Sequence, residues 1–344
     1  MSDFDFIEHF DAPVEVKNEE QLGDNEAVSA INCAFVGFGG GGGKLAKAFL
    51  DLGFNKTLLI NTTHKDQPEG IDPKHVVIVP DADGVAKNIE FGKEVLLQNS
   101  AFVEDALRTK LGKVDWLFVL AGGGGGTGSA CSALHETFER YLSSVGGTGK
   151  VFYIMTWPSA QESLNHTIVK NAFSLSNDIA EHPHIVLSNE RQLGFLRGKV
   201  GIVNMFPTAN TAFAKLFHQI LKLSSEQSSI QTFDSKDLER CFKTPKRTFI
   251  GSTLIQNAKS PNLGSEIFQN CVKKSPCYEM KGNPTTGTIL LVISPEMAAD
   301  PDIGSNLDAA VSYVGGRTET LFSGIYIKEN IPGLIAILSM SGLD

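Results

Sequence analysis

The sequence predicts an α/β protein with a doubly wound, mostly parallel sheet, a long central helix, and a second, smaller α/β (α+β) domain. The first observation is that strand-like apolar runs alternate with helix-like stretches between residues 31 and 187, which is the pattern of successive βαβ units. The second is that two glycine-rich segments each follow a strand-like run and precede a helix-like stretch. Finally, the strand-like runs become fewer and longer beyond Pro245, so a second architecture is expected there.

The first part of the chain supplies the elements of the parallel sheet. Strands are predicted over 31–36, 57–61, 76–79, 116–120, 151–155 and 184–187, because each run is short, apolar and rich in β-branched or aromatic residues. Helices are predicted between them over 44–52, 85–110, 130–144 and 162–179.

A long helix separates the two domains. The apolar stretch 206–224 tolerates Pro207 only because a proline fits the first turn of a helix, and its length would be about 30 Å. Beyond it, strands are predicted over 248–255, 286–293, 321–328 and 334–340, with two helices among them. The expected divisions are a loose arm or short docked helix over 1–26, a first domain over 27–205, the helix and following loop over 206–243, and a second domain over 244–344.

Composition excludes several classes of protein. The chain of 344 residues has a formal charge of −9 and 42% hydrophobic residues, with no long basic run, so direct binding to nucleic acid is not expected. Its five cysteines form no CxxC pair, so neither a disulfide framework nor a zinc site is predicted. No export signal and no membrane span can be identified, and a cytoplasmic protein is expected.

The first glycine segment, VGFGGGGGKLAKAF, satisfies GxGxxG at Gly37, Gly39 and Gly42. A dinucleotide-binding Rossmann fold presents the same motif, but it also needs an acidic residue at the end of the second strand to hold a ribose. Asn61 and Thr62 stand there instead. A nicotinamide-dependent oxidoreductase is therefore the less favoured alternative.

A Walker A phosphate loop is not favoured either. The motif needs a glycine six residues before its lysine and a Ser or Thr directly after it. For Lys44 these positions hold Phe38 and Leu45.

The second glycine segment predicts an anion site. Gly122 to Gly126 are followed by Thr127, Gly128 and Ser129, at the end of one strand and the start of a helix. Backbone N–H groups, a helix N-terminus and two hydroxyls would converge there. A third segment places Gly84, Lys87 and Asn88 after the third strand, and three such loops indicate a triphosphate.

The motif GGGTGSA resembles the signature of the tubulin/FtsZ superfamily of self-assembling GTPases, and the order of loops agrees with it over residues 27–342. The resemblance implies that GTP or GDP and Mg²⁺ bind, with Glu162 on the ribose and Asn189 and Asn210 on the guanine. It implies phosphate and other nucleotide contacts from Gly39, Gly40, Gly41, Gly42, Gly43, Asn61, Thr62, Gly84, Lys87, Asn88, Gly122, Gly123, Gly124, Gly125, Gly126, Thr127, Gly128 and Ser129.

The two asparagines favour guanine over adenine, because an amide offers both an acceptor for guanine N–H groups and a donor for its O6. Without the resemblance, Asn189 would be read as a turn residue and Asn210 as a residue on a helix surface.

Finer detail is most similar to the plasmid- and phage-borne, TubZ-like branch. The segment TFDSKDLERCFKTP follows the long helix, which itself contains NTAFAKLFHQI. Three departures from FtsZ proteins, at Ala130, His166 and Thr211, argue against a cell-division FtsZ.

The resemblance implies that Asp234 and Asp237 are catalytic, and that they act on the nucleotide of the adjacent subunit. Head-to-tail contact of unlike surfaces generates a filament, and Mg²⁺ would be held largely through phosphate and water. Spacing alone favours solvated charges or an N-cap for the helix from Leu238 over a catalytic role, and only the resemblance reverses that preference.

Four hypotheses of function follow. The favoured one is a GTPase that polymerises into dynamic filaments and positions plasmid or phage DNA, with a DNA-binding adaptor or phage cargo as its partner. The alternatives within the same fold are a non-polymerising GTP-binding regulator and an FtsZ-like cell-division protein. The oxidoreductase is the fourth hypothesis.

Overall fold

The computed structural model describes residues 26–80 and 82–344, and the chain divides into two compact units. The first unit contains residues 31–214 with 245–247. The second contains the described residues 26–30 together with 215–244 and 248–344. The arm predicted over 1–26 lies, apart from Glu26, outside the described residues.

The first unit is built on a parallel sheet with the strand order β3-β2-β1-β4-β5-β6. All five neighbouring pairs in this order are parallel, as the alternating pattern predicted. The strands are β1 (Cys33–Phe38), β2 (Thr57–Asn61), β3 (Val76–Ile78), β4 (Trp116–Gly122), β5 (Val151–Trp157) and β6 (His184–Ser188).

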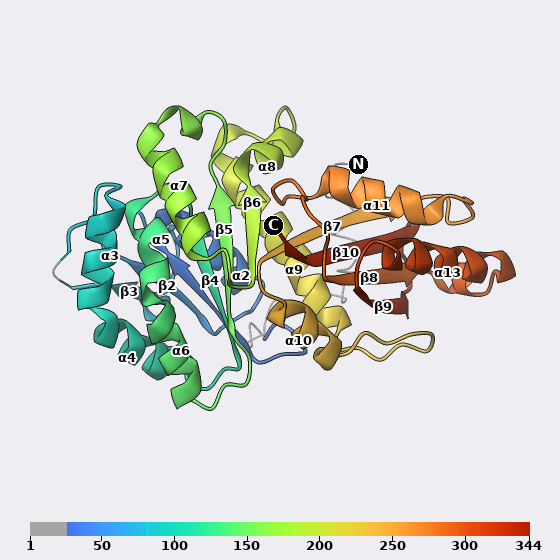
Figure 1. Ribbon diagram of the computed structural model, residues 1–344, viewed down its shortest axis with the longest axis horizontal. Coiled ribbons are helices and arrows are strands. Elements are labelled where there is room, and N and C mark those ends of the chain that lie inside the picture. The colour runs from blue at the N-terminus through green and yellow to red at the C-terminus, as the bar shows by residue number, and fades with distance from the viewer. Residues whose placement is uncertain (1–25, 81) are drawn as a thin grey trace, which may run out of the picture. The chain divides into compact units, whose positions relative to one another are not determined.

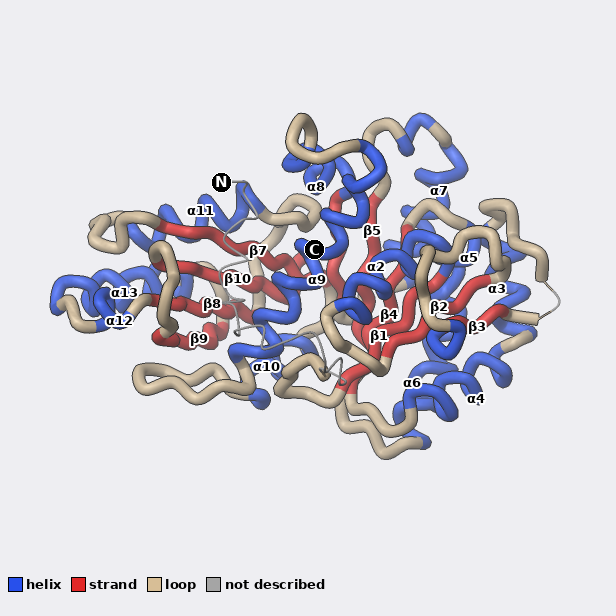
Figure 2. Tube along the Cα trace, turned by 180° about the vertical axis from the view of Figure 1, so that it is seen from behind, coloured by secondary structure: helices blue, strands red, loops and turns tan. Residues whose placement is uncertain are grey.

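Helices cover both faces of this sheet. Alternate residues of β1 show why: Val36 and Phe38 pack into the cluster formed with helices α3, α4, α6 and α7, whereas the ring of Phe35 stacks on Phe49 of α2 at 4.0 Å. Figure 1 shows the face covered by α3, α4, α6 and α7, and Figure 2, from behind, shows α2 over the opposite face. The helices are α2 (Gly39–Asp51), α3 (Ile89–Gln98), α4 (Ser100–Leu111), α5 (Gly126–Ala130), α6 (His135–Ser144), α7 (His166–Asp178) and α8 (Asn189–Leu196).

The single helix predicted over 85–110 is wrong. The chain forms α3 and α4, and Asn99 is the cap between them, with its side-chain amide donating to the Val95 carbonyl at 2.9 Å. An asparagine offers the backbone an alternative partner to the helical ladder, so the helix stops and restarts there.

Two predicted helix starts are too late, because α2 begins at Gly39 rather than at residue 44, and α5 begins at Gly126 rather than at residue 130. Glycine is a poor helix former, but in both segments close packing of the loops decides the conformation. Two others are too early, because α3 begins at Ile89 rather than at residue 85, and α7 begins at His166 rather than at residue 162. Helix α8, directly after β6, was not predicted at all, and Asn189 is its first residue rather than part of a turn.

The second unit contains a mixed sheet with the strand order β7-β10-β8-β9. β10 and β8 are antiparallel and β8 and β9 are parallel. The strands are β7 (Arg247–Ile255), β8 (Thr286–Ile293), β9 (Thr320–Ile327) and β10 (Leu334–Leu343), and the helices are α10 (Ser235–Lys243), α11 (Leu263–Lys274), α12 (Pro295–Ala298) and α13 (Pro301–Gly315). Together with the long helix α9 (Met205–Leu223) of 19 residues, this is the predicted fold class.

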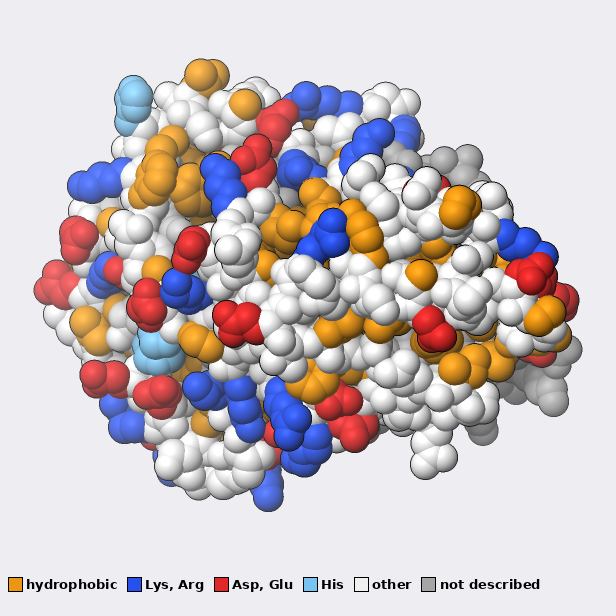
Figure 3. Space-filling model, turned by 45° about the vertical axis from the view of Figure 1, so that its right-hand side comes forward, with side chains coloured by type: hydrophobic (Ala, Val, Ile, Leu, Met, Phe, Trp, Pro, Cys, Tyr) orange, Lys and Arg blue, Asp and Glu red, His pale blue; other side chains and the backbone are white. Residues whose placement is uncertain are grey.

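All five cysteines are buried and none forms a disulfide; they are Cys33, Cys131, Cys241, Cys271 and Cys277. Figure 3 shows acidic and basic side chains interspersed on the face it draws. Within residues 26–80 and 82–344, no helix is both long enough and apolar enough to cross a bilayer.

Candidate functional site

A cavity of about 380 Å³ lies at the carboxyl ends of the parallel strands of the first unit. That volume lies within the range of small-molecule sites, and the carboxyl edge of a doubly wound sheet is where such folds hold ligands. Of the predicted contacts, the cavity is lined by Gly39, Gly40, Gly41, Asn61, Lys87, Gly122, Gly123, Gly124, Gly125, Gly126, Thr127, Gly128, Glu162, Asn189 and Asn210.

Most glycines of the two loops are explained by close packing of the backbone. A Cβ on Gly42 would lie 2.2 Å from the carbonyl oxygen of Leu120, and one on Gly128 would lie 2.8 Å from that of Gly122. These positions hold α2 and α5 directly against β4. Gly42 therefore lies outside the cavity lining, in the wall behind it, as does Gly43, which faces the side chain of Leu59.

Close packing of the backbone does not explain Gly125. Its φ of −82° and ψ of 159° suit any residue, and a Cβ placed on it would meet nothing within 4 Å. Gly125 is exposed and lines the cavity. The absence of a side chain is therefore useful only if a ligand approaches the backbone there.

Cations and free helix ends gather at the glycine end of the cavity. The N-cap residue of α2, Phe38, makes no side-chain cap hydrogen bond, so the first amides of that helix face the cavity without a side-chain acceptor. Lys44, on the next turn, and Lys87 both line the cavity. This combination is suited to a polyanion.

Four predicted contacts lie behind the lining, where they hold the loops. The Thr62 and Thr127 hydroxyls are 2.8 Å apart, and Gly84 donates its N–H to the Thr62 carbonyl at 2.9 Å. The Asn88 side chain accepts from Phe91 N at 3.1 Å as the N-cap of α3. The Ser129 hydroxyl is 3.5 Å from the Gly122 carbonyl.

Asn171, which the sequence analysis missed, ties the second and third loops together. Its amide donates to the carbonyls of Lys87 at 2.8 Å and Gly124 at 3.3 Å. Lys87 and Ala86 both have positive φ values, 62° and 46°, an uncommon conformation for residues with a Cβ. Such strain persists where surrounding contacts impose it.

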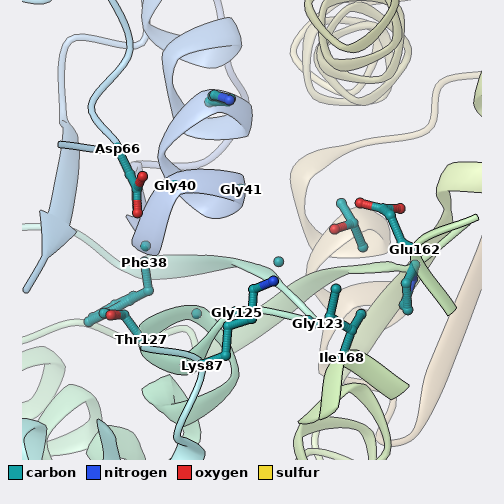
Figure 4. A pocket seen from close by; sticks show the side chains of 18 of the residues that line it. Phe38, Gly40, Gly41, Asp66, Lys87, Gly123, Gly125, Thr127, Glu162 and Ile168 are labelled. Atoms are coloured by element: carbon teal, nitrogen blue, oxygen red, sulfur yellow. The ribbon is translucent and has the colours of Figure 1, made fainter. Parts of the chain in front are cut away.

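The other end of the cavity is lined mainly by polar side chains, with some apolar ones beside them. Glu162 accepts from Ser159 N at 2.7 Å and from the Asn189 side-chain amide at 3.1 Å. Asn189 and Asn210 are both buried, so Asn210 is not the surface residue of the alternative reading. Figure 4 shows Glu162 and Asp66 on opposite sides of the cavity.

Several residues that line the cavity were not predicted, and only some of them could have been inferred from the sequence. Lys44 follows the glycine run directly, so its position was a usable signal. Asp66 lies in the loop after β2 and Ile168 on α7, and no motif marks either. Phe206, at the start of α9, also lines the cavity, although the sequence predicts only an apolar helix there.

Asp234 and Asp237 belong to the second unit and form a capping box at the start of α10. Asp234 accepts from Lys236 N at 2.8 Å and Asp237 N at 3.0 Å, while Asp237 accepts from Asp234 N at 3.5 Å. Burial raises the pKa of Asp237, and the nearby charge of Asp234 adds to the shift. Both carboxylates therefore take part in capping a helix, as the alternative prediction held, but the helix begins at Ser235 rather than at Leu238. Asp234 is exposed.

Comparisons with known proteins identify the fold. No family model matches the chain. The tubulin-like protein CetZ of Methanothrix thermoacetophila is 26% identical over 313 residues, covering 87% of this chain and 81% of CetZ. A crystal structure of a GTPγS-form protofilament of TubZ from Bacillus thuringiensis serovar israelensis matches with a TM-score of 0.74 and 17% identity, covering 92% of this chain and 88% of that one.

CetZ from Methanosaeta thermophila matches with a TM-score of 0.69 and 19% identity, covering 90% of this chain and 86% of that one. The predicted resemblance to the tubulin/FtsZ superfamily is thus confirmed. Because TubZ and CetZ structures match similarly well, the TubZ-like branch stays a prediction.

Proposed function

We propose that this chain, which has the tubulin/FtsZ fold, binds GTP in the cavity of its first unit, hydrolyses it with Mg²⁺, and assembles head to tail into filaments. The observation that carries the proposal is Gly125, whose side-chain direction is open and whose backbone geometry is ordinary. A phosphate group beside the backbone accounts for that glycine.

The glycine end of the cavity fits the triphosphate. The first amides of α2 and the backbone of the second loop would donate to phosphate oxygens, and Lys44 and Lys87 would offset their charge. Asp66 lines the same end, and its carboxylate suits a hydrated Mg²⁺ that is bound mainly by phosphate. Within the described residues, no group of three or more His, Cys, Asp and Glu could hold a metal ion.

The opposite end fits a nucleoside. Glu162 would bind the ribose, and the amides of Asn189 and Asn210 would pair with guanine. Phe206 and Pro158 supply apolar surface for the base. Burial of both asparagines excludes competing water and strengthens such hydrogen bonds.

Hydrolysis would be completed by the next subunit. Asp234 and Asp237 would enter the neighbour's cavity and position the attacking water, which is the main contribution a protein makes to phosphoryl transfer. The capping box leaves Asp234 exposed while fixing its direction. Dependence of turnover on contact between subunits is the expected consequence.

Exposed apolar residues near the cavity support a contact with a second copy. Ile202 and Val203 are each 84% exposed and Leu164 is 81% exposed. Ile202 and Val203 precede the cavity residue Phe206 by a few positions, and Leu164 follows Glu162 closely. Because Ile202 and Val203 are consecutive, they would offer a second copy a continuous apolar surface, which is the kind of patch that marks an interaction site.

A role in segregating plasmid or phage DNA is the favoured biological reading, with a DNA-binding adaptor or phage cargo as partner and the cytoplasm as location. The similarity to TubZ supports it, while the similarity to CetZ leaves the branch open. The capping contacts of Asp234 and Asp237 favour a second candidate, a GTP-binding regulator in which these acids are only structural.

Mixing two variants tests the proposal. Asp237→Ala has an intact cavity without the acid, and Gly125→Ala has the acid with an obstructed cavity. Each variant alone should hydrolyse GTP slowly. An equimolar mixture should regain turnover, because Asp237→Ala supplies the intact cavity and Gly125→Ala supplies the acid. The matched control is Asp300→Ala, which removes the N-cap aspartate of α13 and should leave turnover unchanged. A mixture no more active than its components would contradict the shared site.

A further inference from the structure

Glu162 and Asn189 form a coupled pair, and we infer that Glu162 determines the base specificity of the cavity by fixing the orientation of the Asn189 amide. The inference rests on the proposed binding of GTP. It assigns Glu162 a role in reading the base, in addition to the ribose contact that the family resemblance implies.

The contact itself sets the orientation. An ionised carboxylate has no hydrogen to donate and only accepts hydrogen bonds. The atom of Asn189 that lies 3.1 Å from Glu162 Oε2 must therefore be the NH₂ nitrogen, because the amide oxygen would be repelled. Hydrogen bonds to a carboxylate are also stronger than neutral ones, so the flipped amide is disfavoured.

Fixing the nitrogen also fixes the carbonyl oxygen on the opposite side of the amide. Asn189 is only 8% exposed and lines the cavity, so the base and the protein are its available partners. Guanine carries donors at N1 and N2, whereas adenine carries an acceptor at N1. An Asn189 carbonyl that cannot exchange places with its nitrogen accepts from guanine N1 or N2 and is repelled by the lone pair of adenine N1.

Glu162 is itself held in place before any ligand binds. The same Oε2 accepts from Ser159 N at 2.7 Å, and Ser159 Oγ accepts from Glu162 N at 3.3 Å. A second carboxylate anchors the same loop, because Glu190 accepts from Ala160 N at 2.9 Å and from Arg197 at 3.0 Å. Rigid support of this kind keeps a recognition group in its productive geometry.

Glu190 provides a matched control. It lies on α8 next to Asn189, carries the same charge and contacts the same loop, but its carboxylate accepts from Ala160 and Arg197 rather than from the Asn189 amide. Neutralising Glu190 changes local charge and loop anchoring without freeing the amide. Neutralising Glu162 removes the acceptor-only partner, because a glutamine can pair with either end of Asn189.

The test compares Glu162→Gln, Glu190→Gln and the wild-type chain by competition of GTP, ATP and dGTP against a fluorescent GTP analogue. The ratio of GTP to ATP affinity reports the base, and the ratio of GTP to dGTP affinity reports the ribose. For Glu162→Gln the first ratio should fall by about tenfold or more, the difference expected for a charge-assisted hydrogen bond. For Glu190→Gln it should equal the wild-type ratio. Thermal unfolding of each variant checks that the fold is kept.

Two results overturn the inference. If Glu162→Gln weakens GTP and ATP equally while the preference for GTP over dGTP disappears, Glu162 is only a ribose contact. If both variants lower the ratio of GTP to ATP equally, loop anchoring rather than amide orientation sets specificity. A wild-type chain that binds no guanine nucleotide would refute the proposed function first, and the inference would fall with it.

Discussion

Replacing Gly125 with alanine separates binding from folding in the second glycine loop. The new Cβ meets nothing within 4 Å and the backbone angles are ordinary, so the free energy of unfolding should stay within about 0.5 kcal/mol of wild type. If a phosphate occupies that space, the methyl group overfills the bound state. Overpacking costs about 1–3 kcal/mol, which corresponds to about five- to 150-fold weaker binding.

Gly42→Ala is the matched variant in the neighbouring loop. Its Cβ would lie 2.2 Å from a backbone oxygen, that of Leu120, which cannot rotate away. A loss of about 2 kcal/mol or more in the free energy of unfolding is expected, even though alanine gains about 1 kcal/mol in helix propensity. Urea unfolding and titration with a fluorescent GTP analogue measure both quantities. A Gly125→Ala chain that binds GTP as tightly as wild type would refute the assignment of phosphate to this loop.

Three further predictions concern catalysis, assembly and pH. Asp237→Ala should slow GTP turnover about 100-fold and prolong filament lifetime while GTP affinity stays unchanged; normal turnover would remove Asp237 from the catalytic proposal. The double variant Ile202→Ser with Val203→Ser should raise the concentration at which the protein pellets with GTP, without loss of unfolding stability, because both side chains are 84% exposed in the free chain; unchanged pelleting would refute their role in the contact. Burial lowers the pKa of His184 to about 4, with the Nδ1–H bond to the His182 carbonyl opposing the shift. The group binds its proton less readily when folded, so stability is fully present above pH 6.5, and about 3 kcal/mol is lost as the pH falls to about 4; His184→Asn, followed by urea unfolding, should lose less over that range.

The sheet of the first unit could be predicted because its strands are buried on both faces and therefore appear as continuous apolar runs. The strand Thr57–Asn61 was predicted with its observed ends. Helix boundaries were harder to predict from the sequence. At the start of α2, the packing of Gly39 on Gly128 and of Gly42 on Leu120 overrides helix propensity. At Asn99, one side-chain hydrogen bond divides a periodic stretch that gives no other sign of a break.

The site could be predicted where close approach to the backbone restricts the residue type in the sequence. Runs of glycine mark the phosphate end, and Lys44 follows one of them. Asp66 and Asn171 leave no such trace, because each reaches the loops only through the folding of distant segments. The Glu162–Asn189 contact joins residues 27 positions apart, and the spacing alone does not indicate that they meet.

The dependence of GTP turnover per subunit on protein concentration tests the central claim most directly. If the acid of one subunit completes the site of the next, turnover per subunit should be near zero in dilute protein and rise steeply above the concentration at which filaments form. Turnover per subunit that is the same in dilute monomers and in concentrated protein would contradict the claim.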